Sequence, residues 1–231
     1  MIVDETAGQA VLGNRGQAYR WGGIAAFIIA AGYLAIIPLF ANVGTPPTGG
    51  EGFFNYLPGK TTIWWWILGL SVFTDLLYIP LALSLYMALK PVNKYLMALA
   101  VIFMGMFVVL DLAMTQGHYA SILTLFHNYS LAADGAHRAA FLAAAEYAAA
   151  VLATPMEIVY AIVIPSIGVL LTGIVMLKSK FGKAAAWLAL ITGFLGILSL
   201  TGWFPVIMGN ALFVTAWFFV VGWKLMRLAR E

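Results

Sequence analysis

Four acidic residues stand within or beside long apolar runs of this chain: Asp75, Asp111, Glu146 and Glu157. A charged side chain near the centre of a membrane helix costs roughly 2.5–3.5 kcal/mol on insertion scales. Acids in such surroundings therefore face the interior of a helix bundle, pair with another group or hold a proton. These residues are the first candidates for chemistry.

Asp75 lies near the middle of the apolar run 61–89. Ser71 and Tyr78 stand four residues before it and three after it, so an α-helix places both hydroxyls on its face. Two interpretations stay open. Asp75 is a structural acid that is neutral or hydrogen-bonded to those hydroxyls, or it handles a proton or a cation.

A second polar group follows from Asp111, with Thr115 and His118 at helical spacing on one face. Glu157 and Asn210 fall at a similar depth of other apolar runs. This convergence predicts a ligand-binding set, which together with the first group comprises Asp75, Tyr78, Asp111, Thr115, His118, Glu157 and Asn210.

Imidazole and carboxylate are ligands for zinc and other divalent metals, and they also relay protons. Asp111, His118 and Glu157 are the candidate metal ligands, with Zn as the candidate cofactor. The chain has no HExxH motif, three histidines and no cysteine. A structural hydrogen-bond network and a site for a polar ligand or a proton explain the same residues, so all three interpretations stay open.

The composition indicates what positions these side chains. Of 231 residues, 63% are hydrophobic and 9% are charged, and the mean hydropathy is +0.96. A soluble domain has about 25% charged residues, so this chain needs the lipid bilayer as its partner. The basic residues lie in short clusters between apolar runs, a pattern that indicates membrane topology and not nucleic acid.

The hydropathy predicts an all-α, polytopic membrane protein, a six-transmembrane-helix bundle in a single domain, 1–231. A spanning helix needs roughly 20 apolar residues. The predicted spans are 21–43, 61–89, 95–116, 156–177, 184–200 and 204–225. The alanine-rich stretch 137–154 is expected to form an additional outer-face helix, capped by Asp134 and supported by an Asp134–Arg138 pair.

Ten of the twelve lysines and arginines fall on one side of these six spans; Lys60 and Arg138 fall on the other. Basic residues stay in the cytoplasm. We therefore expect a multi-pass protein of the bacterial inner membrane with cytoplasmic N- and C-termini. Trp64, Trp65 and Trp66 are expected to anchor the outer interface.

The fifth span has small residues at helical spacing, which let another backbone approach closely. They are expected to pack within the bundle or to form a seam with a homo-oligomer or membrane-complex partner. This stripe consists of Gly182, Ala186, Ala189, Gly193 and Gly196.

The stretch 75–99 contains an acid inside a span, a turn of the form L-Y-x-x-L-K-P-V-N and an apolar helix that resumes at once. It resembles a family of uncharacterised bacterial multi-spanning membrane proteins, known chiefly as a domain of unknown function. The resemblance implies an inner-membrane helical bundle and no reaction. The alanine-rich stretch 137–154 departs from that family's pattern.

Three functions remain as hypotheses. The first, which we favour, is binding or transport of a small ligand or ion through an outward-facing polar cavity in the membrane. The second is a membrane-embedded, metal-dependent enzyme of the hydrolase type. The third is a non-catalytic subunit or scaffold of a larger membrane complex.

Overall fold

Six apolar helices build this protein. The computed structural model describes residues 3–231, with side chains from Arg15 onward, and within that range the secondary structure is helical without a strand. Six helical segments are long and apolar enough to cross a membrane. This confirms the predicted all-α six-span bundle.

The spans are formed by α-helices that two π-helical segments interrupt. The main helices of the spans are α1 (Val3–Val43), α3 (Thr61–Leu89), α4 (Lys94–Leu110), α8 (Ile164–Met176), α9 (Lys183–Leu198) and α10 (Phe204–Leu228). The remaining elements are α2 (Gly50–Tyr56), α5 (Gly117–Leu131), α6 (Gly135–Leu152), α7 (Met156–Ile158), the π-helices η1 (Asp111–Gln116) and η2 (Val159–Val163), and the 3-10 turn η3 (Ser199–Thr201).

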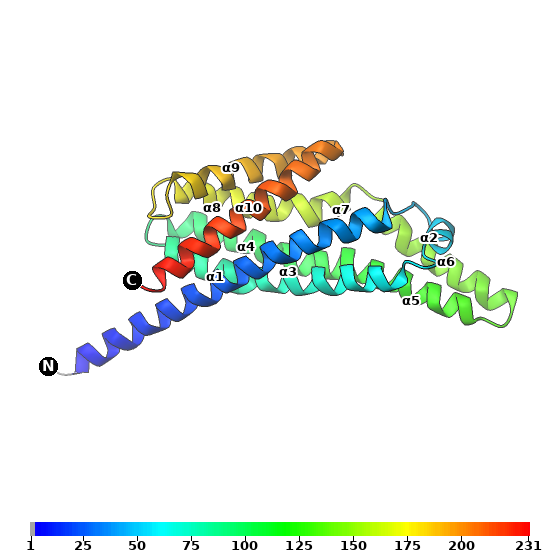
Figure 1. Cartoon of the computed structure of the whole chain (residues 1–231), viewed down its shortest axis with the longest axis horizontal. Helices are drawn as coiled ribbons and strands as arrows, with labels where there is room; N and C mark the ends of the chain where they lie inside the picture. Colours follow the sequence, from blue (N-terminus) through cyan, green and yellow to red (C-terminus); the bar gives the residue numbers. More distant parts are fainter. Residues whose placement is uncertain (1–2) are drawn as a thin grey trace.

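The spans form a closed ring in chain order. Each packs on the span before it and after it, and α10 closes the ring against α1. Small residues allow this closure, since a Cβ added at Gly222 would lie 3.1 Å from the carbonyl oxygen of Gly23. Both termini lie at one end of the bundle (Figure 1), which we call the inner end; the opposite end is the outer end.

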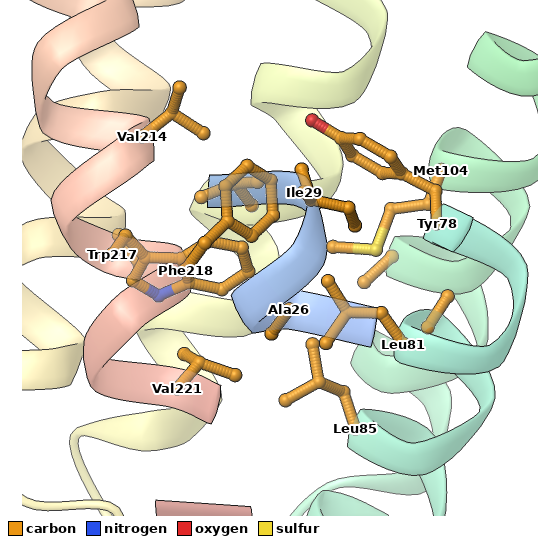
Figure 2. Close-up of a cluster of buried hydrophobic side chains, with 14 of the residues drawn as sticks. Ala26, Ile29, Tyr78, Leu81, Leu85, Met104, Val214, Trp217, Phe218 and Val221 are labelled. Carbon is orange, nitrogen blue, oxygen red and sulfur yellow. The ribbon is translucent and has the colours of Figure 1, made fainter. Parts of the chain in front are cut away.

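Large side chains fill the ring in its inner half. Trp217 and Phe218 of α10 point toward Ile29 of α1, and Tyr78 of α3 and Met104 of α4 meet them from the other side (Figure 2). Both α10 rings are fully buried. The bundle is therefore closed on its inner side, and the space in its outer half ends on this core.

The helix of the third span is much longer than the predicted span. The prediction ended the span at residue 116, but the helix continues through η1 into α5 as Lys94–Leu131, 38 residues. At about 1.5 Å per residue this helix is roughly 57 Å long, whereas the hydrocarbon core is roughly 30 Å thick. Its outer part, α5, pairs with α6 and extends beyond the other spans at the outer end (Figure 1).

A second apolar cluster, the outer cluster, joins α2, α5 and α6 to the outer ends of α1 and α3. Trp64 belongs to it. Its ring stacks on Tyr119 with centroids 5.0 Å apart, and its Nε1 donates to the Tyr56 oxygen at 3.3 Å. The prediction that Trp64 anchors the interface is therefore wrong, because the side chain is buried inside the protein; Trp65 and Trp66 are exposed, as predicted.

Two acids fasten the outer elements. Asp134 caps α6 as predicted, accepting from the N–H of His137 at 2.8 Å, and this bond lowers the pKa of Asp134. The side-chain partner of Asp134 is the His137 ring, at 2.7 Å, and not the predicted Arg138, which donates to the carbonyl of Ala132. Glu146 accepts from the N–H of Glu51 at 3.1 Å, and the N–H groups of Gly50 and Glu51 lower the pKa of Glu146.

The small-residue stripe of α9 packs against α8. A Cβ added at Gly193 would collide with the Cβ of Leu170, and one added at Gly196 would collide with the side chain of Ser166. Ala186 and Ala189 are fully buried. The stripe therefore packs within the bundle, which was the first of the two predicted roles. An oligomer would have to use another surface.

Candidate functional site

A cavity of about 660 Å³ occupies the outer half of the ring. Its walls come from the outer parts of α1, α3 and α10, from η1 and η2, and from the loop that follows α1. Most of the lining is apolar. The polar lining side chains are Tyr33, Thr45, Ser71, Thr74, Asp75, Asp111 and Gln116.

Asp75 and Asp111 form a carboxyl pair in the wall of this cavity. The two side chains come from α3 and η1, they lie within hydrogen-bonding reach of each other, and both are buried. Asp75 Oδ2 and Asp111 Oδ1 have no other hydrogen-bond partner in the part of the chain that the structure describes. The expectation that Ser71 and Tyr78 bond to Asp75 is wrong, since Tyr78 bonds to Tyr33 and the partner of Asp75 is a second acid.

The π-helical segment η1 supplies a further polar residue. Gln116 Nε2 donates to Asp111 Oδ2 at 2.8 Å, across five positions of the chain. In a π-helix the backbone bonds run from i to i+5, so residues five apart come to lie on one face. Gln116 could not be predicted as a partner of Asp111 from α-helical spacing, which brings together residues three and four apart. A proline or glycine that would have indicated the change is absent from residues 111–116.

The second π-helical segment, η2, packs against η1 beside the cavity. It has a cause in the sequence. Pro165 carries no N–H, so the bond that position 165 would make to the carbonyl of Ala161 in an α-helix cannot form. Ala161 itself lines the cavity. Two opposed π-helical turns thus border the carboxyl pair, and such turns occur frequently at functional sites.

A smaller pocket of about 180 Å³ lies on the inner side of the cavity and shares Tyr33 with it. The hydroxyls of Tyr33 and Tyr78 are hydrogen-bonded at 2.9 Å between the two spaces. Asn210 lines this inner pocket and donates to the carbonyl of Thr192 at 2.8 Å and to Ser166 at 3.4 Å. Asn210 therefore ties α8, α9 and α10 together next to the site.

The structure does not bring the other predicted residues to the cavity wall. Glu157 accepts from the Tyr119 hydroxyl at 3.4 Å, between the carboxyl pair and the outer cluster. The His118 ring bonds to the carbonyl of Met114 in its own helix and lies 6.2 Å from the Tyr147 ring of α6. The π-helical turn between Asp111 and His118 adds a residue, so the two no longer share a face. Thr115 is buried, and its hydroxyl has no hydrogen-bond partner among the described residues.

No family model, curated protein or solved structure matches this chain.

The resemblance to a family of multi-spanning membrane proteins therefore rests on residues 75–99 alone. The turn at its centre follows from local chemistry. Asn93 caps α4 by accepting from the N–H of Leu96 at 3.0 Å, and Pro91 cannot continue α3. The motif thus specifies a tight connection at the inner end, and function must be argued from the cavity.

The described residues contain no group of three His, Asp or Glu side chains placed to hold one metal ion. Asp111 and Glu157 are near each other, but His118 is turned toward α6. The zinc site therefore stays a prediction, for elemental analysis of the purified protein to decide.

The ionisable side chains in the cavity wall are acidic, apart from the Tyr33 hydroxyl. None of the lining residues that the structure describes is Lys, Arg or His. The acids nearest the cavity are Asp75, Asp111 and, behind them, Glu157. An anionic ligand would find no cationic side chain among these lining residues, whereas a cation or a hydrogen-bond donor would meet carboxyl oxygens.

Proposed function

We propose that this protein binds a small ligand from the outer side of the membrane, in the cavity that holds Asp75 and Asp111. The observation that carries this proposal is a cavity of suitable volume whose wall holds buried carboxyl oxygens without a hydrogen-bond partner outside the pair. The cavity measures about 660 Å³, inside the roughly 300–1,000 Å³ range of small-molecule pockets. Two buried carboxyl oxygens in the pair have no other partner in the described chain.

Burial of an unpartnered polar group costs free energy, so it persists where function requires it. The walls of the cavity are otherwise mostly apolar and aromatic, which suits a ligand with an apolar body and one polar group. The core around Trp217 and Phe218 closes the inner side. These features support an outward-facing binding state, and a carrier would need a second state that opens toward the inner end.

The orientation in the membrane belongs to the same proposal. Arginines and lysines cluster at the inner end with both termini, and cytoplasmic segments are enriched in these residues. We place the inner end in the cytoplasm of a bacterium and the cavity on the outer side of its plasma membrane.

Filling the cavity tests the proposal. Ala211 lines the cavity, and Ala216 lies on the same helix with its side chain exposed. The variants Ala211→Phe and Ala216→Phe introduce the same ring into the same helix, in the cavity and outside it. A panel of small cationic, neutral and anionic compounds is screened for stabilisation of the full chain in detergent.

We expect at least one compound to raise the melting temperature of the wild type and of Ala216→Phe, but not of Ala211→Phe. A compound that stabilises all three proteins equally binds elsewhere. If every stabilising compound behaves in this way, the cavity is not the binding site.

A further inference from the structure

The two acids of the carboxyl pair have different surroundings. Asp111 Oδ2 accepts a hydrogen bond from Gln116 at 2.8 Å, and a donated hydrogen bond favours the charged form of a carboxylate. In the described chain the side chain of Asp75 has one hydrogen-bond partner, which is Asp111. The pair is therefore asymmetric although both members are aspartates.

A hydrogen bond between two carboxyl groups requires a proton on one of them, because carboxylate oxygens only accept. Two carboxylates in contact in a buried site do not both ionise readily. Since Gln116 stabilises the charge on Asp111, the proton belongs on Asp75. The pair then presents one negative charge to the cavity.

From this asymmetry we infer that the ligand is a singly charged organic cation, with Asp111 as its counter-ion and Asp75 as the protonated partner that holds Asp111 in place. The inference rests on the proposed function. It adds the chemical class of the ligand and gives the two acids different roles.

The walls support an organic ligand over a metal ion. The rings of Tyr33, Phe40, Phe107 and Phe204 line the cavity, and aromatic faces attract alkylammonium groups. Calcium takes six to eight oxygen ligands and magnesium needs near-octahedral geometry, but the described residues contain no group of three acidic or histidine side chains placed around one point. A singly charged cation would also neutralise the one negative charge of the carboxyl pair, so the complex would bury no net charge.

Three probes of similar size test the charge selection: benzyltrimethylammonium, benzyl alcohol and benzoate. The first carries a permanent charge, so it cannot itself gain or lose a proton. Binding is measured by titration calorimetry on the full chain in lipid nanodiscs, for the wild type, Asp75→Asn and Asp111→Asn. The Asp75→Asn change leaves a neutral hydrogen-bond donor at that position, as the protonated acid does. Asp111→Glu serves as a charge-preserving variant should Asp111→Asn fold poorly.

We expect the wild type to bind the cation with a Kd at least about tenfold lower than that for benzyl alcohol, because 1.4 kcal/mol of binding free energy corresponds to a factor of ten in Kd. Asp75→Asn should keep this preference and Asp111→Asn should lose it. The binding enthalpy should also be the same in two buffers of different ionisation enthalpy, because the pair keeps its proton.

Equal loss of the preference in both variants, or release of a proton on binding, would show that both acids carry charge and would overturn the inference. So would equal binding of all three probes. Those results would leave the cavity as a binding site. The proposed function fails separately, through Ala211→Phe, if filling the cavity changes the binding of no compound.

Discussion

Trp64 and Trp65 are adjacent in the chain but lie in different surroundings, which makes them a matched pair for testing the outer cluster. The Trp64 side chain is 1% exposed, and that of Trp65 is 48% exposed. Besides stacking on Tyr119, the Trp64 ring meets Phe40 edge-on with centroids 5.8 Å apart. We predict that replacing Trp64 with alanine destabilises the protein far more than the same change at Trp65.

The magnitude follows from the contacts that are lost. Truncation of a buried tryptophan to alanine costs about 3–5 kcal/mol, including the cavity left behind. Aromatic pairs such as Trp64–Tyr119 contribute about 0.5–1.5 kcal/mol of this beyond the buried area. At roughly 2–4 °C per kcal/mol for a chain of this size, the melting temperature should fall by about 6–20 °C. Trp65→Ala should stay within about 0.5 kcal/mol of the wild type, the usual range for a surface change.

Thermal unfolding is followed by the helical circular dichroism band of the full chain in mild detergent. Tryptophan fluorescence is unsuitable, since the substitution removes part of the signal. If both variants lose the same stability, Trp64 faces lipid as Trp65 does. The packing of α2, α5 and α6 on the outer end of α3 would then be wrong.

Three further predictions concern helix packing, topology and the first turn of α2. Gly196→Ala should destabilise the bundle by about 1–3 kcal/mol through overpacking against α8, measured as a lower melting temperature. In this cysteine-free chain, a cysteine at Ser130 should react with a membrane-impermeant maleimide on intact spheroplasts, and one at Lys180 only after permeabilisation. Two N–H donors in the first turn of α2 lower the pKa of Glu146. Glu146 should therefore hold this turn at pH values above the ordinary carboxyl pKa and release it as the pH falls through the lowered pKa, seen as faster amide exchange after correction for intrinsic rates.

Each of these has a matched comparison. Gly69→Ala meets open space and should be neutral or slightly stabilising, so an equal loss at both glycines would contradict the packing. Labelling at position 180 and not at 130 in intact cells would invert the topology. In Glu146→Ala, amide exchange in residues 49–57 should be fast at every pH. Unchanged protection from exchange in that variant would show that other contacts hold this segment.

Hydropathy predicted the number of spans because lipid demands an apolar helix wherever the chain crosses. It did not predict that the helix of the third span runs past residue 116, because hydropathy reports the apolar segment and not the length of the helix that contains it. The helix continues there because α6 and α2 cover its outer part. Trp64 was misplaced for the same reason: its burial depends on Tyr119, which stands 55 positions away in another element.

The individual acids Asp75 and Asp111 were predicted, but their pairing was not. Which residues meet across two helices depends on relative rotation and depth, and neither follows from one sequence. The pairing of Asp111 with Gln116 was hidden by a change of helical period, and the same change separated His118 from Asp111. Asn210 was predicted as a member of the ligand-binding set, and in the structure its hydrogen-bond partners are Ser166 and Thr192.

The π-helical turn η1 holds one residue more than an α-helical turn of the same height. Removal of a single residue from η1 would therefore leave an uninterrupted α-helix in which α5 keeps its rotation relative to α4, and Tyr119 would stay on Trp64. The same deletion within a regular α-helical stretch would rotate the helix that follows by about 100°, one position at 3.6 residues per turn. The extra residue thus changes which side chains of residues 111–116 face the cavity and leaves the orientation of the outer cluster unchanged.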